Sequence, residues 1–167
     1  MKNKITSIVL IVSAVICVLS AILMIVALSS NKKFDDDFAV KFDENASLGY
    51  PDIYEEQQLY IVTNKNENFE AYVCYYALTE GKKITVGFTN PSHNNVLMQL
   101  FVYGKNDRYL GNTDFIKAGE YIMDFELTKK PKDGEMLKYK VICYEDGTYY
   151  SAGVAVGEGT AISEFSK

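Results

Sequence analysis

Three cysteines and a single histidine are the residues of this sequence with the most specific chemistry. Cys17 lies inside an apolar stretch, which leaves Cys74 and Cys143 as a pair in the polar part of the chain. In an oxidising compartment such a pair can form a disulfide, or both residues can be small buried side chains with free thiols. The sequence leaves both interpretations of the pair open.

The same residues also allow nucleophilic catalysis, in which His93 would assist the thiolate of Cys143. This outline resembles the sortases, which are membrane-anchored transpeptidases with a β-barrel, a histidine and a later cysteine at a strand end. Sortases have threonine two residues before and directly before that cysteine, where this chain has Val141 and Ile142. They also need an arginine after it, and the only arginine here is Arg108. A sortase-like enzyme is therefore the alternative, and a non-enzymatic protein is the prediction.

The remaining candidate residues predict no cofactor and no metal. His93 lies in the polar loop 90–95, and neither Cys74 nor Cys143 has a CxxC partner or a neighbouring histidine. The glycines near the C-terminus are too widely spaced for a phosphate-binding loop. The acidic run 35–37 lacks the alternating ligands of a calcium loop.

The stretch that decides where such residues would act is residues 5–28, which contain no charged side chain. As a helix this stretch would extend roughly 36 Å, enough to cross a bilayer core of about 30 Å. It is longer than the apolar region of a cleaved signal peptide, although cleavage after Ser29 is an alternative. Ile16, before Cys17, is too large for a lipoprotein signal. We predict a retained signal anchor.

The flanking charges predict the orientation of this anchor. Lys2 and Lys4 precede the apolar stretch without a nearby acid, whereas Lys32 and Lys33 are followed directly by acidic residues. The positive-inside rule then places the N-terminus in the cytoplasm and the C-terminal domain outside the cell membrane. The net charge of −5 and the scarcity of arginine argue against nucleic acid as a partner. We expect the partner to be another cell-surface or membrane protein.

Composition divides the chain into three parts. Residues 1–30 hold the cytoplasmic N-terminus and the anchor, and residues 31–58 form an acidic juxtamembrane stalk. Residues 59–167 alternate aromatic and β-branched side chains with polar ones, as strands do. About seven or eight short strands separated by turns predict an antiparallel, immunoglobulin-like β-sandwich. The spacing of Cys74 and Cys143 is near that of immunoglobulin cysteines, but the tryptophan of that pattern is absent.

The last hairpin has the clearest local pattern. Asp146 and Gly147 are typical of a two-residue type I′ turn, which would fix the register of the strands on either side. The residues on one face of the resulting ladder are all apolar or aromatic, so we predict that this face is the core. The predicted core pairs are Cys143 with Tyr150, Val141 with Ala152, Tyr139 with Val154 and Leu137 with Val156.

The opposite face of this hairpin is the predicted partner surface. It pairs Tyr144 with Tyr149, and it carries Ile142 two residues along from Tyr144, together with Lys138 and Lys140. Tyrosines next to an aliphatic side chain offer rigid contact area with a hydroxyl at its edge, which is typical of interfaces. The alternative is that another layer of the fold covers this face.

Residues 84–146 also resemble a known kind of domain. A strand, the Asn90-Pro91 turn, the connection DFIKAGEY and the segment KDGEMLKYKVICY follow one another. This order resembles the β-sandwich domain of small single-span or lipid-anchored surface proteins of Gram-positive bacteria. The resemblance implies an extracytoplasmic sandwich and implies no activity. We therefore expect a protein that binds a partner or assists assembly at the cell surface, with a glycan-binding or small-ligand-binding module as a further alternative.

Overall fold

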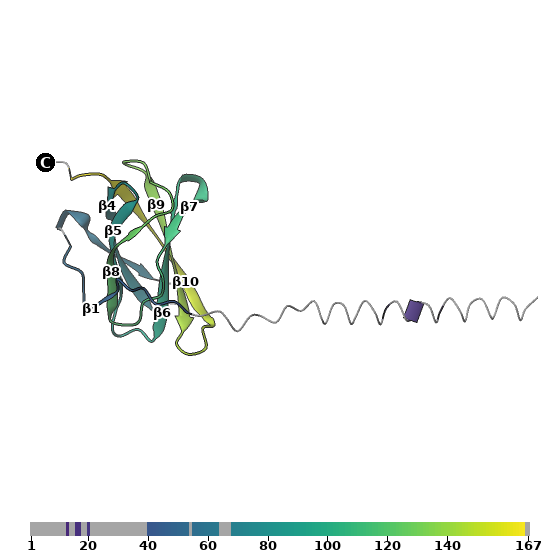
Figure 1. The fold of residues 1–167 in the computed structure, drawn as a ribbon. Coiled ribbons are helices and arrows are strands. Elements are labelled where there is room, and N and C mark those ends of the chain that lie inside the picture. Colours follow the sequence, from purple (N-terminus) through teal and green to yellow (C-terminus); the bar gives the residue numbers. More distant parts are fainter. Residues whose placement is uncertain are drawn as a thin grey trace, which may run out of the picture. The chain divides into compact units, whose positions relative to one another are not determined.

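The computed structural model describes residues 40–53, 55–63 and 68–165, with four helical residues nearer the N-terminus, Ser13, Ile16, Cys17 and Ser20. The chain divides into two compact units, Met1–Ala39 and Val40–Lys167. The second unit holds the strands (Figure 1). Among the described residues, no helix is long and apolar enough to cross a membrane. The anchor predicted at residues 5–28 lies outside the described residues, apart from those four.

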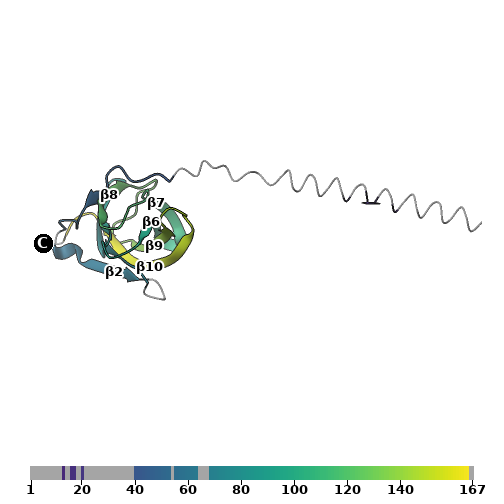
Figure 2. The same ribbon diagram turned by 90° about the horizontal axis from the view of Figure 1, so that it is seen from below.

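The described part of the second unit is built from ten strands and two short 3-10 helices, η1 (Glu55–Gln57) and η2 (Lys105–Asp107), so the all-β prediction is confirmed. The strands form one sheet in the order β1-β8-β5-β4-β10-β9-β6-β7, with β3 paired to β5 and β2 to β3. The sheet curls around its interior (Figure 2). The immunoglobulin-like topology is not confirmed. The strands are β1 (Ser47–Leu48), β2 (Leu59–Thr63), β3 (Glu70–Cys74), β4 (Tyr76–Glu80), β5 (Lys83–Asn90), β6 (Val96–Gly104), β7 (Arg108–Asn112), β8 (Glu120–Glu126), β9 (Met136–Glu145) and β10 (Ser151–Ile162).

The core contains the β9 residues that were predicted to face inward. Leu137, Tyr139, Val141 and Cys143 have no exposed surface, whereas the residues between them are partly or fully exposed. They join one hydrophobic cluster with inward residues from most of the other strands. The Tyr139 hydroxyl donates a hydrogen bond of 3.2 Å to the backbone carbonyl of Cys74, which connects β9 to β3 through the core.

The final hairpin does not have its predicted register. Residues 146–149 form its turn, in place of the two-residue turn, and two backbone hydrogen bonds of 2.9 Å on Glu145 close it. A β-bulge follows near the start of β10. Cys143 consequently pairs with Gly153 and not with Tyr150, so the predicted register is wrong.

Because of this difference in register, the residues of β10 that were predicted to face the core face solvent. A shift by an odd number of residues exchanges the two faces of a strand, so Gly157 is buried while Val154 and Val156 are 40% and 52% exposed. Close packing against Tyr139 explains the outcome. A Cβ on Gly159 would lie 2.6 Å from Cε2 of the Tyr139 ring, so only glycine leaves room for this buried side chain.

Residues 40–58 were expected to belong to a stalk, but the described ones pack against the sheet. Phe42 forms a bridge with Phe115, and β1 pairs with β8. Gln57 is buried, and its side-chain amide lies 3.5 Å from the backbone carbonyls of Tyr76 and Thr85. These residues are therefore part of the second compact unit. Their apolar side chains are few and lie among acidic and polar residues, so the composition of this segment indicated a stalk and did not reveal this packing.

Candidate interaction surface

His93 lies in the turn between β5 and β6, and it faces a carboxylate rather than a cysteine. Its Nε2 is 3.1 Å from Oε1 of Glu70, which also accepts a 2.7 Å hydrogen bond from the Tyr72 hydroxyl. This hydrogen bond, with burial, raises the pKa of Tyr72 to about 12. The Asn94 side chain donates to the Glu70 backbone carbonyl at 2.7 Å and so holds the turn against β3. The cavity beside His93, of about 270 Å³, does not include Cys143.

Cys143 lies instead in the core, paired with Met98 of β6 and Gly153 of β10. It has no exposed surface, and burial raises the pKa of its thiol. Burial also raises the pKa of the Cys74 thiol, to about 12. Buried thiols that stay protonated at neutral pH are inert as nucleophiles and as metal ligands. The His93–Cys143 arrangement that a sortase-like mechanism needs is therefore not formed.

Cys74 and Cys143 are both free thiols in this structure. This matches the second of the two interpretations of the pair, in which each is a small buried side chain. Within the described part of the chain, no group of three or more His, Cys, Asp or Glu side chains could hold a metal ion.

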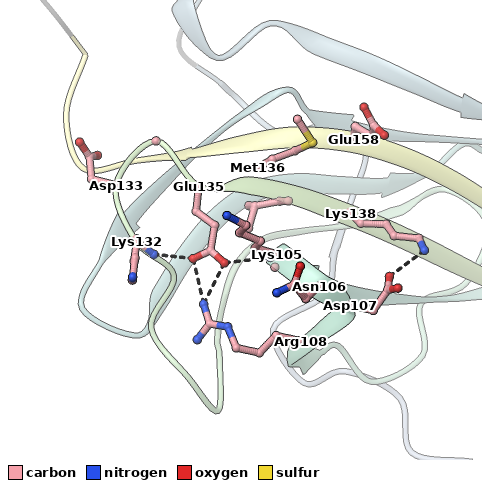
Figure 3. A pocket seen from close by; sticks show the side chains of 13 residues that line it. Lys105, Asn106, Asp107, Arg108, Lys132, Asp133, Glu135, Met136, Lys138 and Glu158 are labelled. Atoms are coloured by element: carbon pink, nitrogen blue, oxygen red, sulfur yellow. Dashed lines mark hydrogen bonds and ion pairs between the residues drawn. The ribbon is translucent and has the colours of Figure 1, made fainter.

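A half-open groove of about 850 Å³ lies between the β6–β7 turn and the loop before β9 (Figure 3). Glu135 organises this groove. Its carboxylate accepts hydrogen bonds from the backbone N–H groups of Lys105 and Lys132, at 3.0 and 2.8 Å. The Arg108 guanidinium donates to both carboxylate oxygens, at 2.9 and 2.8 Å.

The electrostatics of the groove indicate a structural role. Burial alone would raise the pKa of Glu135, but these hydrogen bonds and the charge of Arg108 outweigh it and lower the pKa to about 2. At the other end of the groove, the ammonium of Lys138 lies 2.9 Å from the carboxylate of Asp107. We interpret Glu135 as a clamp that joins the β6–β7 turn to the start of β9, because its carboxylate is already occupied by protein donors.

Accessible apolar side chains gather on the solvent side of the β9–β10 ladder. Ile142 of β9 pairs directly with Val154 of β10, and Val156 follows on the same side of β10. Ile142 is half-buried and the two valines are exposed. Phe101 and Tyr103 of β6, both half-buried, continue this side because they pair with lysines of β9. We call this surface the outer β9–β10 face; its residues are Gln99, Phe101, Tyr103, Lys138, Lys140, Ile142, Val154, Val156 and Glu158.

Of the three residues predicted for the partner surface, only Ile142 lies on this face with neighbouring exposed aliphatic side chains. Tyr144 is half-buried and packs edge-on against the ring of Phe115, with centroids 5.1 Å apart. Tyr149 lies in the hairpin turn with a φ of 57°. The predicted pairing of Tyr144 with Tyr149 is wrong, because Tyr144 pairs with Ser151.

Sequence reasoning missed Val154 and Val156, which it assigned to the core. The signal that could have placed them outside is the alternation of small residues along β10, where Ala155, Gly157 and Gly159 fall on the other side. Small residues at every second position indicate a side that faces bulky neighbours. The described geometry thus offers an accessible apolar surface on the β9–β10 ladder. No protein-family model, no curated protein and no solved structure matches this chain.

Proposed function

We propose that this chain is a non-enzymatic module that binds another protein, or assists assembly, at the outer side of a cell membrane. Residues 5–28 anchor it, and the outer β9–β10 face is its partner surface. One observation carries the proposal: Ile142, Val154 and Val156 form a contiguous aliphatic group on the solvent side of a regular ladder.

The chemistry of this face suits a protein partner. Burying exposed aliphatic surface contributes about 25 cal/mol per Å² removed from water. Tyr103 and Phe101 add rigid aromatic area at the edge, which is characteristic of interfaces. Lys140 lies between the apolar side chains, where its charge favours acidic groups on the partner and its aliphatic stem covers apolar surface. Lys138, at the end of this face, is already paired with Asp107.

We also propose the finer architecture, an immunoglobulin-like sandwich. β10 supports it, because this strand pairs with β9 over most of its length and with β4 in parallel at its end, from Thr160 to Ile162. One long strand thereby belongs to both halves of the curled sheet, and their inward residues meet in one cluster. An experimental structure with two separable sheets would support this assignment, and a closed barrel would contradict it.

Site-specific photo-crosslinking in intact cells tests the partner surface. A photoreactive amino acid at Val156 of the full-length protein should form an adduct with one discrete membrane or surface protein. The same amino acid at Leu48, an exposed aliphatic position on β1, is the matched control and should form none. Equal labelling from both positions, or no adduct from Val156, would contradict the proposal.

The topology is tested separately. With residues 5–28 retained, the protein should remain in membranes after alkaline carbonate washing, and protease added outside intact cells should remove the domain. A soluble mature form that begins near Ser30 would contradict the anchor.

Thiol labelling separates the proposal from the sortase-like alternative. In the folded protein, Cys74 and Cys143 should both resist a water-soluble maleimide and should react only after denaturation, because neither has exposed surface. Rapid labelling of Cys143 in the folded protein, slowed by replacing His93 with alanine, would favour the enzyme instead.

A further inference from the structure

The turn between β9 and β10 exposes two tyrosines. Tyr149 and Tyr150 are 37% and 74% exposed. Within the described part of the chain, neither aromatic ring packs against another ring and neither hydroxyl has a hydrogen-bond partner. A tyrosine side chain has an apolar ring and a polar hydroxyl, a combination that favours the boundary between an apolar and an aqueous phase. Both rings are thus accessible for a contact outside the domain.

Hydrogen bonds within the turn hold the two tyrosines in place. The N–H of Tyr149 donates to the backbone carbonyl of Glu145, and the N–H of Glu145 donates to the carbonyl of Tyr150, both at 2.9 Å. The Thr148 hydroxyl donates to the Glu145 carboxylate at 2.9 Å. The backbone that carries both rings is therefore already ordered, which reduces the entropy that a contact would cost.

Tyr149 adopts a backbone conformation that tyrosine disfavours. Its φ of 57° lies in the left-handed region, where asparagine and aspartate are tolerated and a bulky side chain is rare. A glycine would occupy this position without strain. Such an outlier points to a use for the side chain itself, because the turn does not need a tyrosine here.

The turn lies beside the first described residues of the domain. Phe42 forms a bridge with Phe115, whose ring packs against that of Tyr144 near the end of β9, with centroids 5.1 Å apart. The backbone N–H of Phe115 also donates to the carbonyl of Lys41 at 3.0 Å. Figure 1 shows the β9–β10 turn at the lower end of the domain. The start of the domain and the two tyrosines therefore lie at the same end.

We propose that the β9–β10 turn rests on the surface of the membrane in which the chain is anchored, with the rings of Tyr149 and Tyr150 at the level of the lipid headgroups. This rests on the anchor at residues 5–28, which is part of the proposed function. Residues 29–39 join that anchor to the domain, and these eleven residues span at most about 40 Å. So short a tether keeps the turn close to the lipid, where even a weak contact is populated.

The charges beside the two rings select the kind of headgroup. Glu145 and Asp146 are exposed acidic residues next to the tyrosines, and they repel an anionic lipid surface. A zwitterionic headgroup instead presents an ammonium group, which both an aromatic ring and a carboxylate attract. The ligand is therefore the surface of a zwitterionic phospholipid bilayer.

A membrane contact at this turn also orients the outer β9–β10 face. β9 and β10 both extend away from the turn, so their ladder would stand upright on the membrane. The outer β9–β10 face would then be directed sideways, toward a neighbouring protein in the same membrane. The two tyrosines are not part of that face, so either proposal can fail while the other holds.

Tryptophan fluorescence tests the contact, because the chain contains no tryptophan. Full-length Tyr150→Trp is reconstituted into zwitterionic phospholipid vesicles, with or without bromine atoms on the acyl chains near the headgroups. The brominated lipid should reduce the emission at least twofold. Met136→Trp, at the other end of β9 and 65% exposed, is the matched control and should not be quenched. Equal quenching at both positions, or no quenching of Tyr150→Trp, would overturn the proposal.

A reporter in the anchor separates failure of the contact from failure of the anchor. Leu23→Trp lies within residues 5–28 and should be quenched in the same brominated vesicles. Quenching of Leu23→Trp without quenching of Tyr150→Trp would overturn the membrane contact alone. Absence of quenching at both positions would overturn the anchor as well.

Two further measurements test the chemistry of the contact. In the Tyr150→Trp background, Tyr149→Gly removes one ring and relieves the strained φ, so the turn still forms and quenching should fall at least twofold. Anionic vesicles should also reduce the quenching, because Glu145 and Asp146 oppose them. Quenching that is unchanged in Tyr149→Gly, or that is as strong on anionic vesicles, would overturn the proposal.

Discussion

The two strands of the final hairpin contribute to the core in opposite ways. β9 supplies bulk, because Leu137, Tyr139 and Val141 are its inward residues and all have no exposed surface. β10 supplies space, because the residues directly opposite are Gly159, Gly157 and Ala155. The larger side chains of β10 lie on the solvent side.

This difference shows that the two strands are matched in size and not in hydrophobicity. The ring of Tyr139 occupies the volume that a side chain at Gly159 would need, and Val62 of β2 does the same at Gly157. Where the inward side chains of one strand are large, the inward side chains of its neighbour must be small. The larger apolar side chains of the neighbouring strand then lie on the solvent side.

The largest effect is expected where this matching is broken. In Gly159→Ala the new methyl group would lie 2.6 Å from Cε2 of Tyr139 and 2.7 Å from the backbone carbonyl oxygen of Tyr75. Because a backbone atom cannot move aside cheaply, we expect a loss of about 3 kcal/mol in the free energy of unfolding. Thermal melts followed by circular dichroism on the full-length protein in detergent will measure it.

A second glycine of the same hairpin is the control. Gly147 lies in the turn with a φ of 82° and has open space around a Cβ. Gly147→Ala should therefore cost only about 1 kcal/mol, from backbone strain. Equal costs at the two glycines would show that β10 is not packed as described.

The next largest effect concerns the Glu135 clamp at the start of β9. β10 has no such clamp. Glu135→Gln keeps the shape of the side chain but removes the charge that Arg108 and two backbone N–H groups bind. The pKa of Glu135 falls from 4.5 to about 2 on folding. At 1.36 kcal/mol per pKa unit, this amounts to about 3 kcal/mol, reduced to roughly 2 kcal/mol by the partial exposure of Arg108.

The pH dependence of this difference follows from the direction of the shift. A carboxylate with a lowered pKa stabilises the folded state above its unfolded pKa, and this contribution is lost as the pH falls toward the folded value. The gap between wild type and Glu135→Gln should therefore be full at pH 7 and shrink between pH 4.5 and about 2. Glu158→Gln, on an exposed side chain, is the control; a comparable loss there would contradict the clamp.

A smaller effect is expected from removing the Tyr139 hydroxyl, a polar group that β9 places in the core. Tyr139→Phe removes only the hydroxyl that donates to the Cys74 carbonyl at 3.2 Å. Losing one buried hydrogen bond should cost about 1 kcal/mol in unfolding free energy. Urea titration of wild type and variant will show it as a lower midpoint with an unchanged slope. An unchanged midpoint would mean that the hydroxyl does not hold β9 to β3.

Some of this architecture could be predicted from the sequence, and the reasons are specific. The inward residues of β9 alternate strictly with polar ones, so their side and the all-β class followed from the period of two. The pairing partners of β10 did not follow. Asp146 and Gly147 fit a shorter turn than the one that forms, and a bulge after the turn leaves no mark in composition.

The candidate surfaces were harder to predict than the core. Val154 and Val156 were assigned inward because a hydrophobicity pattern takes valine as buried and glycine as neutral. The exposure of β2 depends on which strands pair at a distance, and its apolar sequence LYIVT is equally suited to a central strand. A local sequence pattern does not show on which side a strand will have no hydrogen-bonded neighbour.

The smallest expected effect decides which side of β10 faces the core. Val156→Thr replaces a methyl group by a hydroxyl at a residue that is 52% exposed, so the unfolding free energy should change by less than about 0.5 kcal/mol. Val141→Thr makes the same change at a fully buried residue, where an added hydroxyl without a partner costs about 1 to 3 kcal/mol. Denaturant melts of the two variants compare them directly. If the residue at 156 faced the core, as the two-residue turn would require, both substitutions would destabilise the protein to the same extent.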